Sequence, residues 1–217
     1  MTPPPSFARA ATPPPADLRV RKSWVDCGCP TPPPHDFKIA VLKAYAAWCK
    51  ARVFVETGTW KGETTAAMQP LFPTVCSIEL APNWASRARQ MFARTPNVEI
   101  IEGDSAKVLP DLLGRIHERC LFWLDGHWCG NDTGGAVLSS AVMGELETIL
   151  AHEISDHVLI IDDARYFVGA YGYPTVDQVR RFVKDRRPDL VFDVAMDSIR
   201  IHPETLPSQP SSSHPTT

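Results

Sequence analysis

The sequence predicts an α/β fold, a doubly wound and mostly parallel sheet that ends in an antiparallel hairpin. Helix-like and strand-like segments alternate through the middle of the chain. The expected strands are short and apolar throughout, which is typical of parallel strands covered by helices on both faces. The last two strand-like segments, 190–194 and 198–202, are separated by a few residues around Met196 and Asp197, which favours a hairpin.

An amphipathic helix is expected over residues 37–50, because Ile39, Leu42, Ala46 and Cys49 share one helical face. The other expected strands are residues 53–56, 75–80, 98–102, 121–124 and 158–161, and the other expected helices are residues 64–71, 84–93, 141–150 and 176–186.

The 217 residues predict one domain with low-complexity ends. Residues 1–28 are expected to form a disordered, proline-rich tail and lead-in, residues 29–203 the folded domain, and residues 204–217 a disordered tail. Segments rich in Pro, Ser and Thr cannot bury enough apolar surface to offset the entropy lost on ordering.

Charge and hydropathy exclude several classes of protein. The formal net charge is −3, so no basic surface indicates a nucleic-acid partner. No apolar run is long enough for a membrane span, and the N-terminus lacks the apolar core of a signal peptide. The six cysteines follow no disulfide pattern, which predicts reduced thiols in a cytoplasmic protein. Cys27 and Cys29 alone are weak evidence for a metal site.

Acidic residues lie at or just after the end of every expected parallel strand. They are Glu56, Glu79, Asp104, Asp125 and the pair Asp162 and Asp163. In open α/β sheets, ligands bind beyond the carboxyl ends of the strands. The sequence therefore predicts an acid-lined binding crevice at this edge of the sheet.

Two cofactor classes compete for such a crevice. A dinucleotide needs a glycine where this chain has the bulky Trp60, and Glu56 would repel its pyrophosphate. S-adenosylmethionine (SAM) carries a sulfonium and an ammonium and suits acids, and Glu79 is placed to accept its ribose hydroxyls. Tight turns that need a positive φ angle are the alternative explanation for Gly58 and Gly62.

Three runs in order resemble the cofactor motifs of class I methyltransferases, which have a Rossmann-like, seven-stranded fold. They are residues 55–59 with Gly62, residues 77–80 and residues 102–105. The resemblance spans residues 29–203 and includes a proline-rich lead-in, 29–38, found in a bacterial group of such proteins. It implies SAM binding by Glu56, Gly58, Gly62, Glu79, Asp104 and Ser105, with the glycines shaping the methionine loop, Glu79 at the ribose and Asp104 near the adenine amine.

The acids after the last two parallel strands suggest a cation. Asp125, Asp162 and Asp163 should converge, and their mutual repulsion would need a positive charge between them. Oxygen ligands select Mg²⁺. The pattern resembles metal-dependent O-methyltransferases of the catechol and macrocin types, which implies that these three aspartates bind Mg²⁺. Capping of a helix by Asp162 and Asp163 is the alternative.

The resulting functional hypothesis is a SAM-dependent O-methyltransferase of a small polar acceptor, with Mg²⁺ assistance. His127 and Asp125 are the expected catalytic residues, because a histidine with a pKa near ~6.5 can remove the acceptor's proton. The macrocin type usually has an acid at the position of His127, so the base stays open. Two alternatives remain: a SAM-binding module without turnover, and a metal-dependent hydrolase or hydroxylase-like enzyme on the same fold.

Overall fold

The computed structural model describes residues 28, 30–126, 141–170 and 172–205. The expected disordered tails therefore lie almost wholly outside the described residues. Among the residues that are described, no helix has the length and apolar character needed to cross a membrane.

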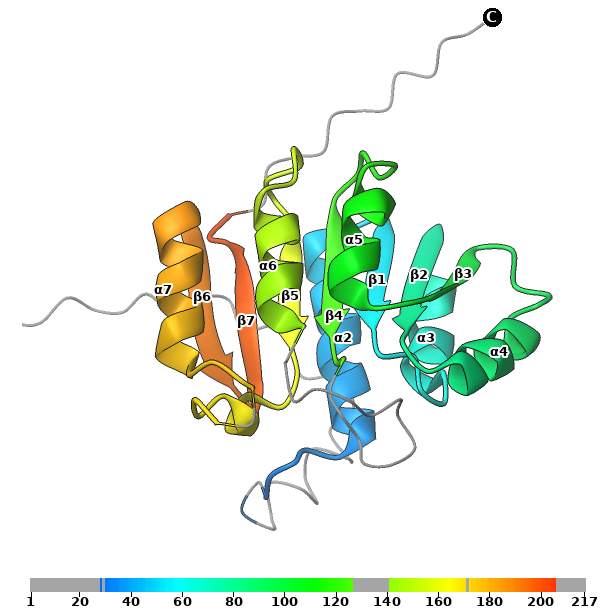
Figure 1. Cartoon of the computed structure of the whole chain (residues 1–217), viewed down its shortest axis with the longest axis horizontal. Helices are drawn as coiled ribbons and strands as arrows, with labels where there is room; N and C mark the ends of the chain where they lie inside the picture. Colours follow the sequence, from blue (N-terminus) through cyan, green and yellow to red (C-terminus); the bar gives the residue numbers. More distant parts are fainter. Residues whose placement is uncertain (1–27, 29, 127–140, 171, 206–217) are drawn as a thin grey trace, which may run out of the picture.

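A seven-stranded sheet forms the centre of the molecule, with the strand order β3-β2-β1-β4-β5-β7-β6 (Figure 1). The strands are β1 (Val53–Thr57), β2 (Thr74–Glu79), β3 (Val98–Glu102), β4 (Cys120–Leu124), β5 (Val158–Ile161), β6 (Leu190–Ala195) and β7 (Ser198–Pro203). The first five pair in parallel, and β7 pairs antiparallel with both β5 and β6. The predicted parallel sheet with a terminal hairpin at one edge is confirmed.

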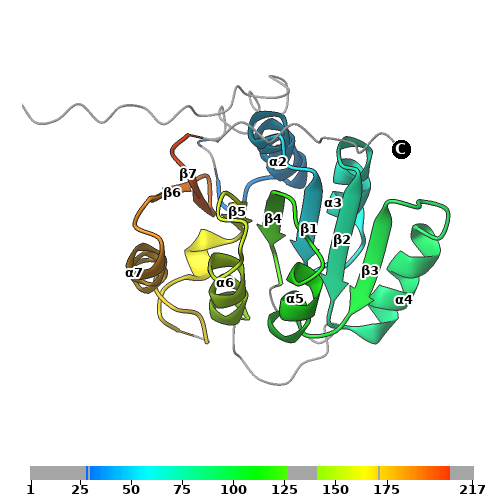
Figure 2. The same ribbon diagram turned by 90° about the horizontal axis from the view of Figure 1, so that it is seen from above.

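Helices cover both faces of this sheet (Figure 2). They are α2 (His35–Cys49), α3 (Glu63–Met68), α4 (Pro82–Met91), α5 (Ser105–Leu113), α6 (Val142–Leu150) and α7 (Val176–Arg186), with short 3-10 turns η1 (Gln69–Leu71) and η3 (Ala164–Tyr166). One hydrophobic core joins α5, α6 and α7 to the sheet, and a second joins α2 and α3 to the opposite face. This double covering explains why the central strands are apolar throughout.

Helix α2 packs against one face of the sheet and carries Lys38 near its start. Leu42 and Cys49 of the predicted apolar face are buried against the sheet, together with Tyr45, whereas Ile39 and Ala46 are partly buried. The helix ends at Lys50, which has a left-handed backbone. Because its C-terminal residue Cys49 lies near the start of β4, bonded through its carbonyl to Arg119, the first turn of α2 lies above the carboxyl ends of the strands.

Helix α5 is a correction to the sequence prediction, which placed no helix between residues 102 and 121. Asp104 caps it by accepting a hydrogen bond from the backbone N–H of Ala106 at 3.1 Å. Pro110 lies inside the helix and interrupts a pattern that would otherwise indicate it. Leu109, Leu112 and Leu113 are nevertheless buried in the core.

The predicted state of the cysteines agrees with the structure where it can be compared. Cys49, Cys76 and Cys120 are buried free thiols. Burial raises the pKa of Cys76 to about 11, so this thiol stays protonated and packs as a small apolar group. Cys27, Cys29 and Cys129 lie outside the described residues.

Candidate functional site

The turn between β1 and α3 brings the ends of β1 and β4 into close contact. Gly58 has a φ of +89°, and a Cβ atom placed on it would lie 2.5 Å from the carbonyl oxygen of Asp125. Gly62 has a φ of +73°. Both glycines therefore meet the demand for a positive φ, and Gly58 also permits a backbone approach that any other residue would block.

Glu56 is enclosed at the end of β1 and only 1% exposed. Ser77 donates a hydrogen bond to its carboxylate at 2.6 Å, and Thr65 donates to the same oxygen. Burial raises the pKa of Glu56 to about 8, outweighing the two hydroxyl donors, and the nearby charges of Asp125 and Glu79 add to the rise. An ammonium group bound at this point would be stabilised by the ionised form.

Glu79 at the end of β2 joins two loops. One carboxylate oxygen accepts the backbone N–H of Trp60 at 2.7 Å, and the other accepts that of Ala81 at 2.8 Å. A carboxylate has about four lone-pair positions, so about two remain for further donors. The predicted ribose contact is compatible with this arrangement.

Asp104 and Ser105, which follow β3, make structural hydrogen bonds beside the binding crevice. Asp104 caps α5, and the Ser105 hydroxyl donates to the carboxylate of Glu145 in α6. Glu145 is 2% exposed and was not singled out from the sequence, because it stands in an ordinary helical pattern. A Cβ atom on Gly126 would lie 3.7 Å from Glu145 and 3.4 Å from the hydroxyl of Thr57, so these groups surround the end of β4.

Thr57, the last residue of β1, has a side-chain hydroxyl beside the binding crevice. Its hydroxyl is buried and has no hydrogen-bond partner among the described residues. Buried hydroxyls without partners are rare in folded proteins and call for a ligand or a water molecule. Together with the buried acids and the left-handed glycines, this hydroxyl fits a polar, cationic cofactor such as SAM.

The three aspartates predicted to converge do so. One carboxylate oxygen from each of Asp125, Asp162 and Asp163 lies within 4.8 Å of those of the other two. Burial and the charges of the other two aspartates raise the pKa of Asp162 to about 7. His127, the expected base, lies outside the described residues.

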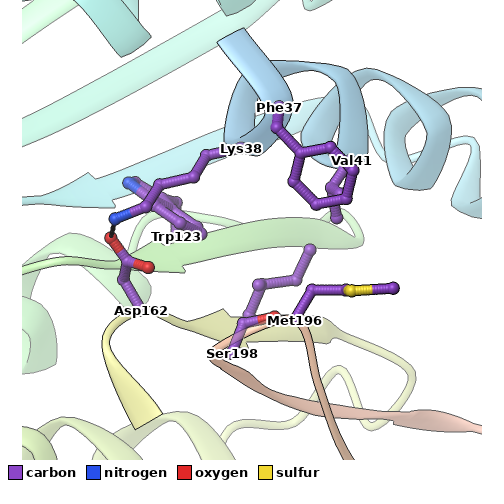
Figure 3. Close-up of a pocket in the computed structure, with 8 residues that line it drawn as sticks. Phe37, Lys38, Val41, Trp123, Asp162, Met196 and Ser198 are labelled. Atoms are coloured by element: carbon purple, nitrogen blue, oxygen red, sulfur yellow. Dashed lines mark hydrogen bonds and ion pairs between the residues drawn. The ribbon is translucent and has the colours of Figure 1, made fainter. Parts of the chain in front are cut away.

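Lys38 from α2 enters this acid cluster, as Figure 3 shows for its contact with Asp162. Its ammonium also lies 3.2 Å from Asp163. Burial alone would lower the pKa of Lys38, but the charges of Asp162, Asp163 and Asp125 and the hydrogen bond to Asp162 together raise it, so the amine stays charged. In the sequence, Lys38 stood out only as the end of the lead-in, and this contact was not predicted.

Arg165 adds a second positive charge at the rim of the cluster. It donates to Asp163 at 2.7 Å and also to Asp197 in the β6–β7 turn. Asp163 has a left-handed backbone and makes no capping hydrogen bond to η3. The capping role considered for Asp163 is therefore not supported.

The oxygen atoms of the cluster are of the kind that Mg²⁺ prefers. The ammonium of Lys38, however, already contacts two of the three carboxylates. In this arrangement the ammonium competes with a metal ion for oxygen atoms of Asp162 and Asp163.

A small cavity adjoins the cluster beneath α2 (Figure 3). It is lined by Phe37, Lys38, Val41, Trp123, Ile160, Asp162, Met196 and Ser198. The indole N–H of Trp123 is buried and lacks a hydrogen-bond partner in the part of the chain that is described. The walls of this cavity are mostly apolar, with Lys38 and Asp162 at the side of the cluster.

No protein-family model matches the sequence, and no protein of curated function matches it. Solved structures with a similar fold are numerous. A putative O-methyltransferase from Klebsiella pneumoniae superposes with a TM-score of 0.56 at 18% identity, covering 87% of this chain and 90% of that one. The O-methyltransferase TomG from Streptomyces achromogenes, in complex with SAM, has a TM-score of 0.53 at 18% identity and the same coverage of 87% and 90%.

A third similar structure is the O-methyltransferase from Bacillus cereus in complex with SAH. It has a TM-score of 0.54 at 16% identity, covering 84% of this chain and 88% of that one. These similarities extend over most of the chain and of each neighbour, at identities of 16–18%. The chain has the fold of the class I methyltransferases.

Proposed function

We propose that this protein is a SAM-dependent methyltransferase that transfers the methyl group to an oxygen atom of a small polar acceptor. The observation that carries the proposal is the gathering of buried acids, left-handed glycines and an unpartnered hydroxyl where β1 and β4 end. The order of the strands changes direction between these two strands, and such switch points are where open α/β sheets bind ligands. The neighbours TomG and the Bacillus cereus protein, named O-methyltransferases and bound to SAM or SAH, support the same function.

We assign protein residues to each part of the cofactor. Gly58 and Gly62 shape the loop around the methionine portion, Glu56 lies where an ammonium would be stabilised, Glu79 holds the ribose, and Asp104 with Ser105 borders the adenine.

The acceptor hydroxyl must lose its proton as its oxygen attacks the methyl carbon and the carbon–sulfur bond breaks. We assign proton removal to Asp125, the residue after β4, and to His127, two positions further along the sequence. Mg²⁺ assistance stays a prediction of the sequence, since Lys38 contacts two of the three expected ligands.

Calorimetry with SAM tests the cofactor, and NAD⁺ serves as the control ligand that an acid-lined crevice should reject. Release of SAH in the presence of small hydroxyl compounds then tests turnover. Binding of SAM without SAH release for any acceptor would favour the non-catalytic module. A failure to bind SAM would refute the proposal.

A further inference from the structure

Lys38 supplies a positive charge inside the acid cluster. Its side chain is 17% exposed, and those of Asp162 and Asp163 are 3% and 13% exposed. Buried carboxylates that lie close together repel one another unless a cation compensates them. Here the compensating cation is part of the chain and reaches the cluster from a helix more than a hundred residues earlier in the sequence.

A divalent metal would have to bind oxygen atoms of the same carboxylates. Mg²⁺ binds carboxylate oxygens at about 2 Å and demands a near-octahedral arrangement. An ammonium that donates to Asp162 and Asp163 directs its protons at the lone pairs that the metal needs. The two cations also repel each other, so the ammonium of Lys38 opposes metal binding at these carboxylates.

We propose that Lys38 is the resident cation of this cluster, that it excludes divalent metal ions, and that methyl transfer in this protein is metal-independent. Only the last clause rests on the proposed function. Lys38 is a positioning residue in this role, because it holds Asp162 and Asp163 in place. Arg165 also contacts Asp163, but its guanidinium is shared with Asp197 in the β6–β7 turn.

Metal binding by the full-length protein tests the first two clauses without SAM or an acceptor. Mn²⁺ is the probe, followed by its electron paramagnetic resonance signal, and Mg²⁺ is added in melting experiments. The wild type should bind no Mn²⁺ at millimolar concentration and should melt at the same temperature with and without Mg²⁺. Binding of Mn²⁺ by the wild type, lost in Asp162→Asn, would overturn the proposal.

The variant Lys38→Met removes the charge and keeps much of the side chain's length. It should gain both Mn²⁺ binding and a rise in melting temperature with Mg²⁺, since a ligand that binds only the folded state stabilises it. Lys43→Met, at an exposed position on the same helix, should behave as the wild type does. A folded Lys38→Met that binds no Mn²⁺ would also overturn the proposal. If this variant folds poorly, recovery of its circular dichroism on addition of Mg²⁺ replaces the melting experiment, and no recovery counts against the proposal.

The third clause has a separate readout. Once an acceptor is known, a chelator should leave the rate of SAH release by the wild type unchanged. A chelator-sensitive rate would refute metal independence while leaving the proposed methyltransferase function intact. Absence of SAM binding in calorimetry would refute the function and leave the metal-exclusion result standing.

Discussion

The two ends of β4 and β5 carry contrasting arrangements of buried polar groups. At the amino ends, Arg119 donates to Asp156 at 2.9 Å and to the carbonyl of Cys49 at 2.8 Å. The backbone N–H of Cys120 donates to His157 at 3.0 Å, and the second ring nitrogen of His157 lies 2.8 Å from His152.

At the carboxyl ends of the same strands, carboxylates lie close together and one buried hydrogen-bond donor has no partner among the described residues. Asp125, Asp162 and Asp163 lie together, with Lys38 among them. The indole N–H of Trp123, near the end of β4, has no partner among the described residues.

The difference shows which end of the sheet stabilises the protein and which is arranged to bind. Satisfied buried networks stabilise a fold, whereas unpartnered groups and perturbed carboxylates concentrate at binding sites. Substitutions at the amino ends should therefore change stability, and substitutions at the carboxyl ends should change affinity.

The largest expected effect is on stability at the amino ends. Arg119→Met removes a 6%-exposed arginine and leaves Asp156 and the carbonyl of Cys49 without their donor. Breaking a buried ion pair by removing one partner costs about 3–5 kcal/mol, and the partial exposure of Asp156 places the expected loss near ~3 kcal/mol. Urea denaturation measures it.

Arg52→Met is the matched control. Arg52 pairs with Glu118 at 2.7 Å, but both side chains are about half exposed. Exposed pairs contribute about 0–1 kcal/mol, so this variant should unfold close to the wild type. Equal losses in the two variants would contradict the contrast between a buried and an exposed pair.

At the carboxyl ends, Glu79→Ala should weaken SAM binding by roughly 1.5–3 kcal/mol, the value of a hydrogen bond to a charged group. The variant also loses the contacts to the backbone of Trp60 and Ala81, so folding is checked by circular dichroism. Glu99→Ala, which removes an exposed acid on β3, is the control in calorimetry. Unchanged affinity in folded Glu79→Ala would remove Glu79 from the cofactor site.

The amino ends should also make the protein sensitive to acid. Burial, helped by the nearby charge of His152, lowers the pKa of His157 from 6.5 to about 3. Below pH 6.5 the unfolded chain therefore binds a proton that the folded chain does not, and stability falls with pH until about pH 3. At pH 5 this contribution is roughly 2 kcal/mol, since each pH unit corresponds to about 1.36 kcal/mol.

His157→Gln tests this assignment, because its amide oxygen can still accept the N–H of Cys120 while the titrating ring is gone. The decline in unfolding free energy between pH 6.5 and pH 5 should become shallower than in the wild type. His117→Gln, which removes an exposed histidine, should keep the wild-type slope. Identical slopes in all three proteins would show that His157 is not the group responsible.

The contrast between the two ends also explains what the sequence predicted and what it did not. The strands 98–102 and 158–161 and the helix 176–186 were predicted with their observed bounds, because apolar runs and helical spacing are local signals. Helix α5 was missed because Pro110 obscures its pattern. The convergence of the three aspartates followed from parallel strands alone. Lys38 was not predicted at the cluster, because its contact with Asp162 joins residues 124 positions apart and depends on how α2 crosses the sheet.

The smallest expected effect on stability concerns Asp104, which has a structural role as a helix cap and a proposed role in cofactor binding. Asp104 caps α5 through one carboxylate oxygen, and its other oxygen lies 3.1 Å from Lys107 in an exposed pair. Asn caps helices about as well as Asp, so Asp104→Asn should change the unfolding free energy by less than about 0.5 kcal/mol.

Cofactor binding should respond differently to the same substitution. With its amide oxygen held by the cap, the substituted side chain would present an NH₂ group toward the adenine amine, where two donors face each other. Loss of one hydrogen bond predicts SAM affinity about 5–10-fold weaker, roughly 1–1.4 kcal/mol. Asp104→Ala removes both functions and should lose about 1 kcal/mol of stability as well. If Asp104→Asn binds SAM as the wild type does, Asp104 serves only as a helix cap, and the adenine must be recognised by other residues at the carboxyl ends of the strands.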